Sequence, residues 1–167
     1  MNKVKFIDKR VLWNQTCAIY SIETTKAETV YMRVNRSDCF DDQRGVVIVD
    51  AKKLLAAWRA YPFYKEPVSF MDEKGWRQDY KFKSAEDGFS HGIENPVPLA
   101  DIGVHPPRGE DGVTSVAFTN GITRTIWLLA NGASAFPIEC HTNEAAALHA
   151  AAGIKEFPAC TVADLLS

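Results

Sequence analysis

The 167-residue sequence predicts an α+β fold in which a mixed β-sheet packs against helices. Two observations lead to this expectation. The N-terminal third consists of β-branched and aromatic runs separated by polar breaks, which is typical of strands. The last third alternates strand, turn, helix, strand and helix, which indicates mixed layers of helix and sheet. The hydrophobic content of 46% is enough for a sizeable core.

The first part of the chain predicts four strands and one helix. The strands are expected at 3–7, 16–23, 29–34 and 46–49. Asp50 is placed to cap a helix over 51–60, whose apolar face carries Leu54, Leu55 and Trp58. The polar loop before the fourth strand holds an aspartate cluster, which is more typical of a solvated loop than of a cation site: Asp38, Asp41 and Asp42.

The middle of the chain has weaker patterns. A strand is expected at 68–71, and aromatic residues alternating with charges predict an exposed strand or hairpin arm at 76–82. Ser84 begins a capping pattern for a short helix that ends near Gly92. Prolines and glycines then predict a loop at 104–112.

The last third has clearer patterns. A strand at 113–119 leads into a helix at 123–131, which Asn131-Gly132 ends as a left-handed cap. Three elements follow: a strand at 136–140, a helix at 144–152 capped by Thr142 or Asn143, and a short final helix capped by Thr161.

The turn between the strand at 113–119 and the next helix has the composition of a phosphate site. Gly121 lets the backbone approach a ligand, while Arg124 carries a permanent charge on a donor fork. The helix directs unpaired N–H groups and its positive dipole end at the same point. We therefore expect phosphate or nucleotide binding at Asn120, Gly121, Thr123, Arg124 and Thr125. An ordinary strand-to-helix turn with Thr123 as its cap explains the local pattern equally well.

A second candidate contact with nucleic acid lies in the most basic short stretch of the chain. Arg77, Lys81 and Lys83 alternate there with aromatic residues that could stack on bases. A strand whose aromatic face is packed is the favoured alternative. The net charge of −2 argues against a large basic surface for DNA.

Composition also constrains compartment and metal content. No apolar run is long enough to span a membrane, and no signal peptide is evident, so we expect a cytoplasmic protein without membrane insertion. The cysteines are widely spaced, lack the CxxC motif of a zinc site and are expected to be free thiols: Cys17, Cys39, Cys140 and Cys160.

Residues 96–141 resemble the core of the ParB/sulfiredoxin superfamily. In that superfamily a strand runs into a Gly-x-x-Arg turn, which is followed by a helix, a glycine turn and a proline-containing strand. Gly121 and Arg124 match the turn, Asn131-Gly132 the glycine turn and 136–139 the strand. The run His105-Pro-Pro-Arg108 is similar to the Pro/Arg box of the superfamily, which adds Arg108 to the expected phosphate-binding residues.

The motif departs from two groups of that superfamily. Ile122 stands where sulfiredoxins carry a reactive cysteine, and neither Ile122 nor Thr123 supplies the acidic residue usual in ParB proteins. The residues after Cys140 are too few for the DNA-binding domain of ParB. The chain is most similar to the plasmid fertility-inhibition factors of the Osa type, which are single-domain members of similar length.

The resemblance implies an organisation and a function. It implies one domain, with a β-rich extension over 1–95 that holds one or two helices, a ParB/sulfiredoxin-like core over 96–141 and C-terminal helices over 142–167. It further implies a factor that blocks type IV secretion of DNA through hydrolysis of ATP or another nucleoside triphosphate and through DNA cleavage. DNA, nucleotide and a secretion or coupling protein are then the expected partners.

Hydrolysis requires a group that activates water or a metal site, and for a nuclease or nucleotidase we expect Mg²⁺ held by substrate phosphates and one or two carboxylates. We expect Arg124 and Glu139 to be catalytic, since Glu139 ends the strand after the motif helix. No set of metal ligands is evident in the sequence. The alternative is a non-catalytic adaptor that binds nucleotide or DNA at the same turn and inhibits a partner protein.

Overall fold

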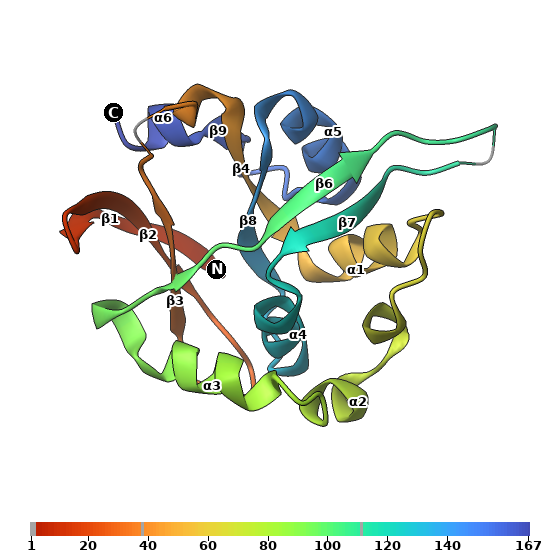
Figure 1. The fold of residues 1–167 in the computed structure, drawn as a ribbon, viewed down its shortest axis with the longest axis horizontal. Coiled ribbons are helices and arrows are strands. Elements are labelled where there is room, and N and C mark those ends of the chain that lie inside the picture. Colours follow the sequence, from red (N-terminus) through yellow and green to blue (C-terminus); the bar gives the residue numbers. More distant parts are fainter. Residues whose placement is uncertain (1–2, 38, 111) are drawn as a thin grey trace.

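Two mixed β-sheets and the helices around them form the protein (Figure 1). The computed structural model describes residues 3–37, 39–110 and 112–167. Sheet A has the order β1 (Val4–Leu12), β2 (Gln15–Ile22), β3 (Val30–Asn35), β5 (Val97–Pro98). Sheet B has the order β7 (Ser115–Asn120), β6 (Asp101–His105), β8 (Ala135–His141), β4 (Arg44–Asp50), β9 (Cys160–Thr161). Neighbouring strands are antiparallel except for the pairs β3–β5 and β6–β8.

The described residues form six α-helices: α1 (Ala51–Arg59), α2 (Glu73–Arg77), α3 (Phe82–Ser90), α4 (Ile122–Ala130), α5 (Thr142–Ala152) and α6 (Val162–Leu165). Helix α4 packs against α2 and α3, while α5 lies along β4 (Figure 1). Short 3₁₀ turns occur at Asp41–Gln43, Pro67–Phe70 and Gly92–Glu94. The predicted α+β class is therefore confirmed.

The two sheets share one hydrophobic core. Met32 of sheet A and Ile138 of sheet B are almost completely buried within it, as are Leu128 of α4 and Leu148 of α5. Sheet B takes β4 and β9 from outside residues 96–141. The proposed division into an extension, a core and C-terminal helices stays a prediction.

The chain crosses from one sheet to the other within a few residues. Strand β5 ends at Pro98 and β6 begins at Asp101, so this crossing between the sheets consists of Leu99 and Ala100 alone. The Leu99 N–H donates to the Arg33 carbonyl at 2.9 Å, which ties the crossing to β3. The Ala100 carbonyl accepts from the Glu139 N–H, also at 2.9 Å, which ties it to β8. The crossing is therefore hydrogen-bonded on both sides.

The middle of the chain is helical where strands were expected, so two predictions were wrong. Residues 76–82 belong to the end of α2, a connecting turn and the start of α3, because Asp72 caps α2 by accepting from the Gly75 N–H at 3.1 Å. Trp76 is buried, and its indole N–H donates to the Val68 carbonyl at 2.8 Å. Residues 68–71 form most of a 3₁₀ turn that begins at Pro67. Aromatic residues of these segments pack inward from helices.

Two predicted caps also differ from the structure. Helix α3 begins at Phe82, so Ser84 lies inside it. His141 caps α5 through its side chain, in place of Thr142 or Asn143. The caps at Asp50 and Thr161 are confirmed.

The end of α4 confirms the glycine cap. Gly132 has a φ of +77°, and its N–H donates to the Leu129 carbonyl at 3.2 Å. The next N–H, that of Ala133, donates to the Leu128 carbonyl at 3.0 Å, which completes a Schellman motif. Asn131 beside it is buried and accepts from Arg77 of α2 at 3.1 Å. The cap therefore also joins α4 to α2.

Replacing Gly121 by alanine tests the packing at the start of α4. Gly121 has a φ of +101°, and an added Cβ would lie 2.5 Å from the Ala100 Cβ. We expect Gly121→Ala to lower the free energy of unfolding by about 2–4 kcal/mol, measured by urea denaturation. Gly92→Ala is the matched control, because Gly92 has a φ of +65° with nothing within 4 Å of the added Cβ. A loss of only about 1 kcal/mol is expected there. Equal losses in both variants would contradict the close packing of Gly121 on Ala100.

Candidate functional site

The site is built where β7 ends and α4 begins. Gly121 makes the turn in a left-handed conformation and packs against Ala100 of the crossing segment. It has no side chain to cap the helix, so the N–H groups of Ile122, Thr123 and Arg124 lack the usual cap. The positive end of the helix dipole coincides with these groups. This local geometry attracts an anion.

A cavity of about 270 Å³ opens at this turn. Lys81 lies at the start of α3 and brings a second positive charge to a cavity that otherwise belongs to β7 and α4. The lining residues are Lys81, Phe118, Thr119, Asn120, Gly121, Ile122, Thr123 and Arg124. The structure thus joins one predicted DNA-binding residue to four predicted phosphate-binding residues.

Arg124 binds the backbone of the segment that crosses between the sheets. Its Nη1 donates to the carbonyls of Pro98 and Leu99, both at 3.0 Å. Burial lowers the pKa of Arg124, and the nearby Arg33 lowers it further. Thr125 is likewise engaged, because its buried hydroxyl donates to the Gly121 carbonyl at 2.9 Å. The side chains that line the cavity without such bonds to the turn are therefore the better probes of binding.

Three other predicted residues lie outside this cavity. Arg77 donates to the Ala130 carbonyl at 3.2 Å and so binds the end of α4. Lys83 is exposed on α3 and does not line the cavity. The Arg108 guanidinium lies 4.7 Å from the centre of the Phe63 ring, in the loop between β6 and β7. Gly121 follows the opposite end of β7, about 17 Å away along the strand.

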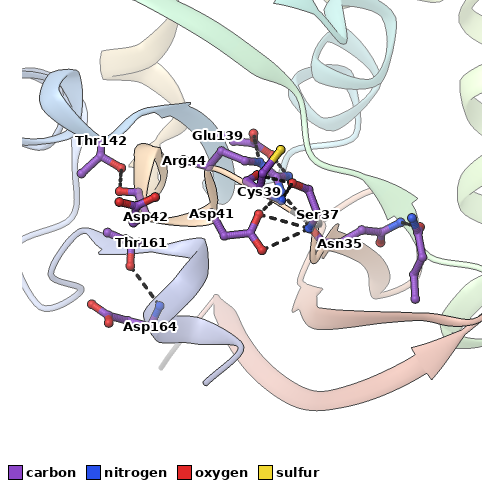
Figure 2. Close-up of polar contacts among 11 residues, drawn as sticks. Asn35, Ser37, Cys39, Asp41, Asp42, Arg44, Glu139, Thr142, Thr161 and Asp164 are labelled. Atoms are coloured by element: carbon purple, nitrogen blue, oxygen red, sulfur yellow. Dashed lines mark hydrogen bonds and ion pairs between the residues drawn. The ribbon is translucent and has the colours of Figure 1, made fainter.

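Glu139 binds Arg44, a residue that the sequence did not single out (Figure 2). The two carboxylate oxygens accept from Nε and Nη2 of Arg44 at 2.9 and 3.0 Å. Nη1 of Arg44 donates to Asp41 at 3.0 Å and to the Asn35 carbonyl at 2.8 Å. The hydrogen bond to Glu139 is the largest of the effects that raise the pKa of Arg44. This network joins β4, β8 and the end of β3 through one guanidinium that is shared by two carboxylates.

Asp101 is a further carboxylate that the sequence did not single out. It lies opposite Asn120 in the β6–β7 ladder and beside Glu139 of β8. Burial raises the pKa of Asp101, and the charges of Glu139 and Glu144 raise it further, while Arg44 lowers it. Asp101 does not line the cavity but pairs with Asn120, which does, and a partly buried carboxyl with a raised pKa in such a place is a candidate general base. Asp101 begins β6, in which partly buried and buried residues alternate, and this alternation is the one feature of the sequence that marks its position.

The remaining chemistry of the described part of the chain is limited. Across residues 3–37, 39–110 and 112–167, no three His, Cys, Asp or Glu side chains gather as metal ligands. Asp41 accepts from the Ser37 N–H, whereas Asp38 lies outside the described residues. Burial raises the pKa of the Cys140 thiol to about 12, so this thiol stays protonated at neutral pH. None of the helices described has the length and apolar character of a membrane span.

The fold and the site place the chain in a broad class of α+β proteins, with two mixed sheets and an uncapped helix start that suits an anion. Comparison with known proteins identifies the family within this class. A family model for plasmid fertility inhibition factors matches residues 46–153, more than half of the chain. The chain therefore belongs to the plasmid fertility inhibition factor family, as the sequence resemblance predicted.

Two relatives support this assignment. A 61-residue segment is 43% identical to Protein osa of Shigella flexneri and covers 36% of this chain. The same segment spans 31% of the length of that curated relative. The crystal structure of Oncogenic Suppression Activity Protein, a plasmid fertility inhibition factor studied as a gold(I) cyanide derivative, is similar with a TM-score of 0.77. That match covers 99% of this chain and 81% of the other at 24% identity, which shows a shared fold.

The raised pKa of Asp101 predicts how stability depends on pH. A carboxyl that binds its proton more tightly in the folded state destabilises the fold as pH rises through that raised pKa. We therefore expect Asp101→Asn to gain stability relative to wild type as pH rises from 4 to about 8. The measurement is urea unfolding of both proteins across this range, with Asp87→Asn as the control for loss of an exposed charge. A stability difference that moves in favour of Asp101 with rising pH would contradict the inferred environment.

Proposed function

We propose that this family member blocks the transfer of DNA through a type IV secretion system by hydrolysing a nucleoside triphosphate and cleaving DNA at the Gly121 turn. Membership of the plasmid fertility inhibition factor family supports the inhibitory function. The order of elements over 96–141, three strands, a glycine turn, a helix and a further strand, supports a ParB/sulfiredoxin-like core. ATP or another triphosphate would be the substrate, together with Mg²⁺.

The observation that carries this proposal is the cavity formed by the start of α4 and Lys81. The N–H groups of Ile122 and Thr123 supply donors for phosphate oxygens, and Lys81 supplies charge from α3. Arg124 holds the crossing segment in place behind the turn. The turn can thus bind phosphate without rearrangement of its backbone, which favours a triphosphate or a DNA phosphate as the ligand.

A carboxylate on the strands next to the turn would activate the attacking water. Asp101 lies directly opposite Asn120, with the two Cα atoms about 5 Å apart. Glu139 lies one strand further, about 10 Å from Asn120, and both of its oxygens bind Arg44. We therefore assign the general base to Asp101 and give Glu139 a supporting part, in which its bonds to Arg44 fix the neighbouring strands. Mg²⁺ would be held by substrate phosphates and one of these carboxylates.

A non-catalytic adaptor is the second candidate, and one observation favours it. Two residues expected to be catalytic, Arg124 and Glu139, are both engaged in internal hydrogen bonds. In this case the turn binds nucleotide or DNA as a ligand only, while another face contacts a secretion or coupling protein. Both candidates share the phosphate-binding turn and differ in turnover.

Purified protein assayed with and without Mg²⁺ separates the two candidates. Release of phosphate from ATP or CTP, or nicking of plasmid DNA, that is lost in Asp101→Asn supports the enzyme. Triphosphate binding without any turnover in wild type supports the adaptor. Turnover that persists unchanged in Asp101→Asn contradicts the assigned base.

Lys81 and Lys83 offer a matched pair for the binding turn itself. Lys81 lines the cavity, whereas Lys83 lies two residues further along and points elsewhere. We expect Lys81→Gln to raise the Kd for a nucleoside triphosphate by about tenfold or more, because a charged contact to phosphate is lost. Lys83→Gln should leave that Kd unchanged. The measurement is isothermal titration calorimetry, and equal Kd values for both variants would place the ligand outside this cavity.

A further inference from the structure

The face of sheet A that points away from the shared core carries charged, polar and aromatic side chains around two buried residues of β2, Ile19 and Cys17. Along β3, Met32 and Val34 point into the core, so Tyr31, Arg33 and Asn35 point to the opposite side. The strand register places Lys5 and Ser21 in line with Tyr31, and Arg10 and Cys17 in line with Asn35. We refer to this side of β1, β2 and β3 as the outer face of sheet A. In Figure 1 these strands lie at the left of the molecule.

One hollow lies on this outer face, and a second lies at the hairpin end of β2, where sheet A meets Arg44 of β4. The first, of about 410 Å³, is lined by Lys3, Lys5, Ile7, Ser21, Glu23, Thr29 and Tyr31. The second, of about 490 Å³, is lined by Asn14, Gln15, Thr16, Asn35, Arg36, Ser37 and Arg44. Both contain cationic side chains and hydrogen-bonding groups. Their separation along β2, from Ser21 to Thr16, is about 17 Å.

Trp13 belongs to the β1–β2 turn beside Asn14 of the second hollow, and its indole contacts Arg33 of β3. Trp13 is 63% exposed, whereas Trp58, Trp76 and Trp127 are at most 6% exposed. The Arg33 guanidinium lies 5.3 Å from the centre of the Trp13 ring. Trp13 and Asn14 turn the β1–β2 hairpin with φ values of +51° and +64°, which holds the indole at the edge of this face. An exposed tryptophan beside an arginine is the arrangement on which an unpaired base can stack.

We propose that the outer face of sheet A binds single-stranded nucleic acid, with bases stacked on Trp13 and Tyr31 and phosphates held by the surrounding lysines and arginines. Arg10 is paired with Asp8 at 3.7 Å, and the remaining cations Lys3, Lys5 and Arg33 outnumber Glu23 on this face. This local excess contrasts with the net charge of −2 for the whole chain. A nucleic-acid strand of about four to eight nucleotides would reach from Tyr31 in the first hollow to Trp13 beside the second.

The same face leads toward the turn at Gly121. Arg33 donates to the Pro96 carbonyl, and Arg124 donates to the carbonyls of Pro98 and Leu99, so both arginines hold one short segment from its two sides. The Nε of Arg33 is buried and has no hydrogen-bond partner among the described residues. A nucleic-acid strand that follows this segment from the outer face would approach the phosphate-binding cavity. The binding proposed here needs no turnover at that cavity and so does not depend on it.

Single-stranded rather than duplex nucleic acid fits this surface for two reasons. Stacking on Trp13 and Tyr31 requires bases that are not paired within a helix. A chain with net charge −2 has no large basic surface to follow two phosphate backbones. The aromatic and cationic side chains of this face therefore suit the unpaired bases and the single phosphate backbone of one nucleic-acid strand.

The test is fluorescence anisotropy of a labelled oligothymidine of about 12 nucleotides, titrated with the full chain in EDTA to prevent cleavage. Trp13→Asn removes the indole and keeps a residue that favours the turn. We expect this variant to raise the Kd by about 5- to 100-fold. Lys5→Gln should make the salt dependence of binding shallower by about 0.7 in log–log slope. The matched controls Tyr64→Thr and Lys52→Gln, at exposed positions elsewhere, should bind as wild type does.

Further arms define the ligand and protect the test against misfolding. Tyr31→Thr keeps a β-forming residue in β3 and decides the question if Trp13→Asn does not fold. An oligouridine of equal length distinguishes RNA from DNA as the bound strand, and a duplex of equal length should bind more weakly than either. Trp13→Asn should keep wild-type affinity for a triphosphate, which separates this surface from the turn at Gly121. Wild-type affinity for the single strand in both Trp13→Asn and Tyr31→Thr, or equal binding of duplex in all proteins, overturns the proposal.

Discussion

Hydrogen bonding along the segment that crosses between the sheets is the constraint on which the rest of the structure depends. This segment is extended, and buried carbonyls without partners would be costly. Arg33 from β3 and Arg124 from α4 supply donors to its carbonyls, and the Glu139 N–H supplies another. Gly121 then packs against Ala100 with no room for a side chain. The position of α4, and of the cavity at its start, follows from how this segment is held.

The local parts of the fold could be predicted because their signals lie within a few residues. Glycines on both sides of α4, Gly121 and Gly132, bound the helix, and both adopt left-handed conformations. The segment 76–82 was mistaken for a strand because its aromatic residues alternate with charges, whereas the cap at Asp72 and the burial of Trp76 against Val68 decide for a helix. Tertiary packing overrode the local pattern there.

The candidate site could be predicted only in part for the same reason. The turn residues are neighbours in sequence, so their grouping was visible, and Lys81 was noticed for its charge without its place in the cavity. Arg44 and Glu139 are far apart in sequence, so no local sequence pattern predicts that they pair. The raised pKa of Asp101 likewise arises from burial and then from Glu139 and Glu144, all of which act on it only in the folded chain. Family membership places the chain among the fertility inhibition factors, and the outer face of sheet A is a surface that the local motifs did not indicate.

The central claim is that phosphate binds to the backbone N–H groups at the start of α4. Amide chemical shifts from ¹H–¹⁵N NMR spectra, followed while a nucleoside triphosphate is added to the full chain, test this claim most directly. The account predicts that the largest saturable shifts occur at the amides of Ile122, Thr123 and Arg124, with smaller ones at Lys81. Saturable shifts confined to other parts of the chain, with these amides unchanged, would contradict it.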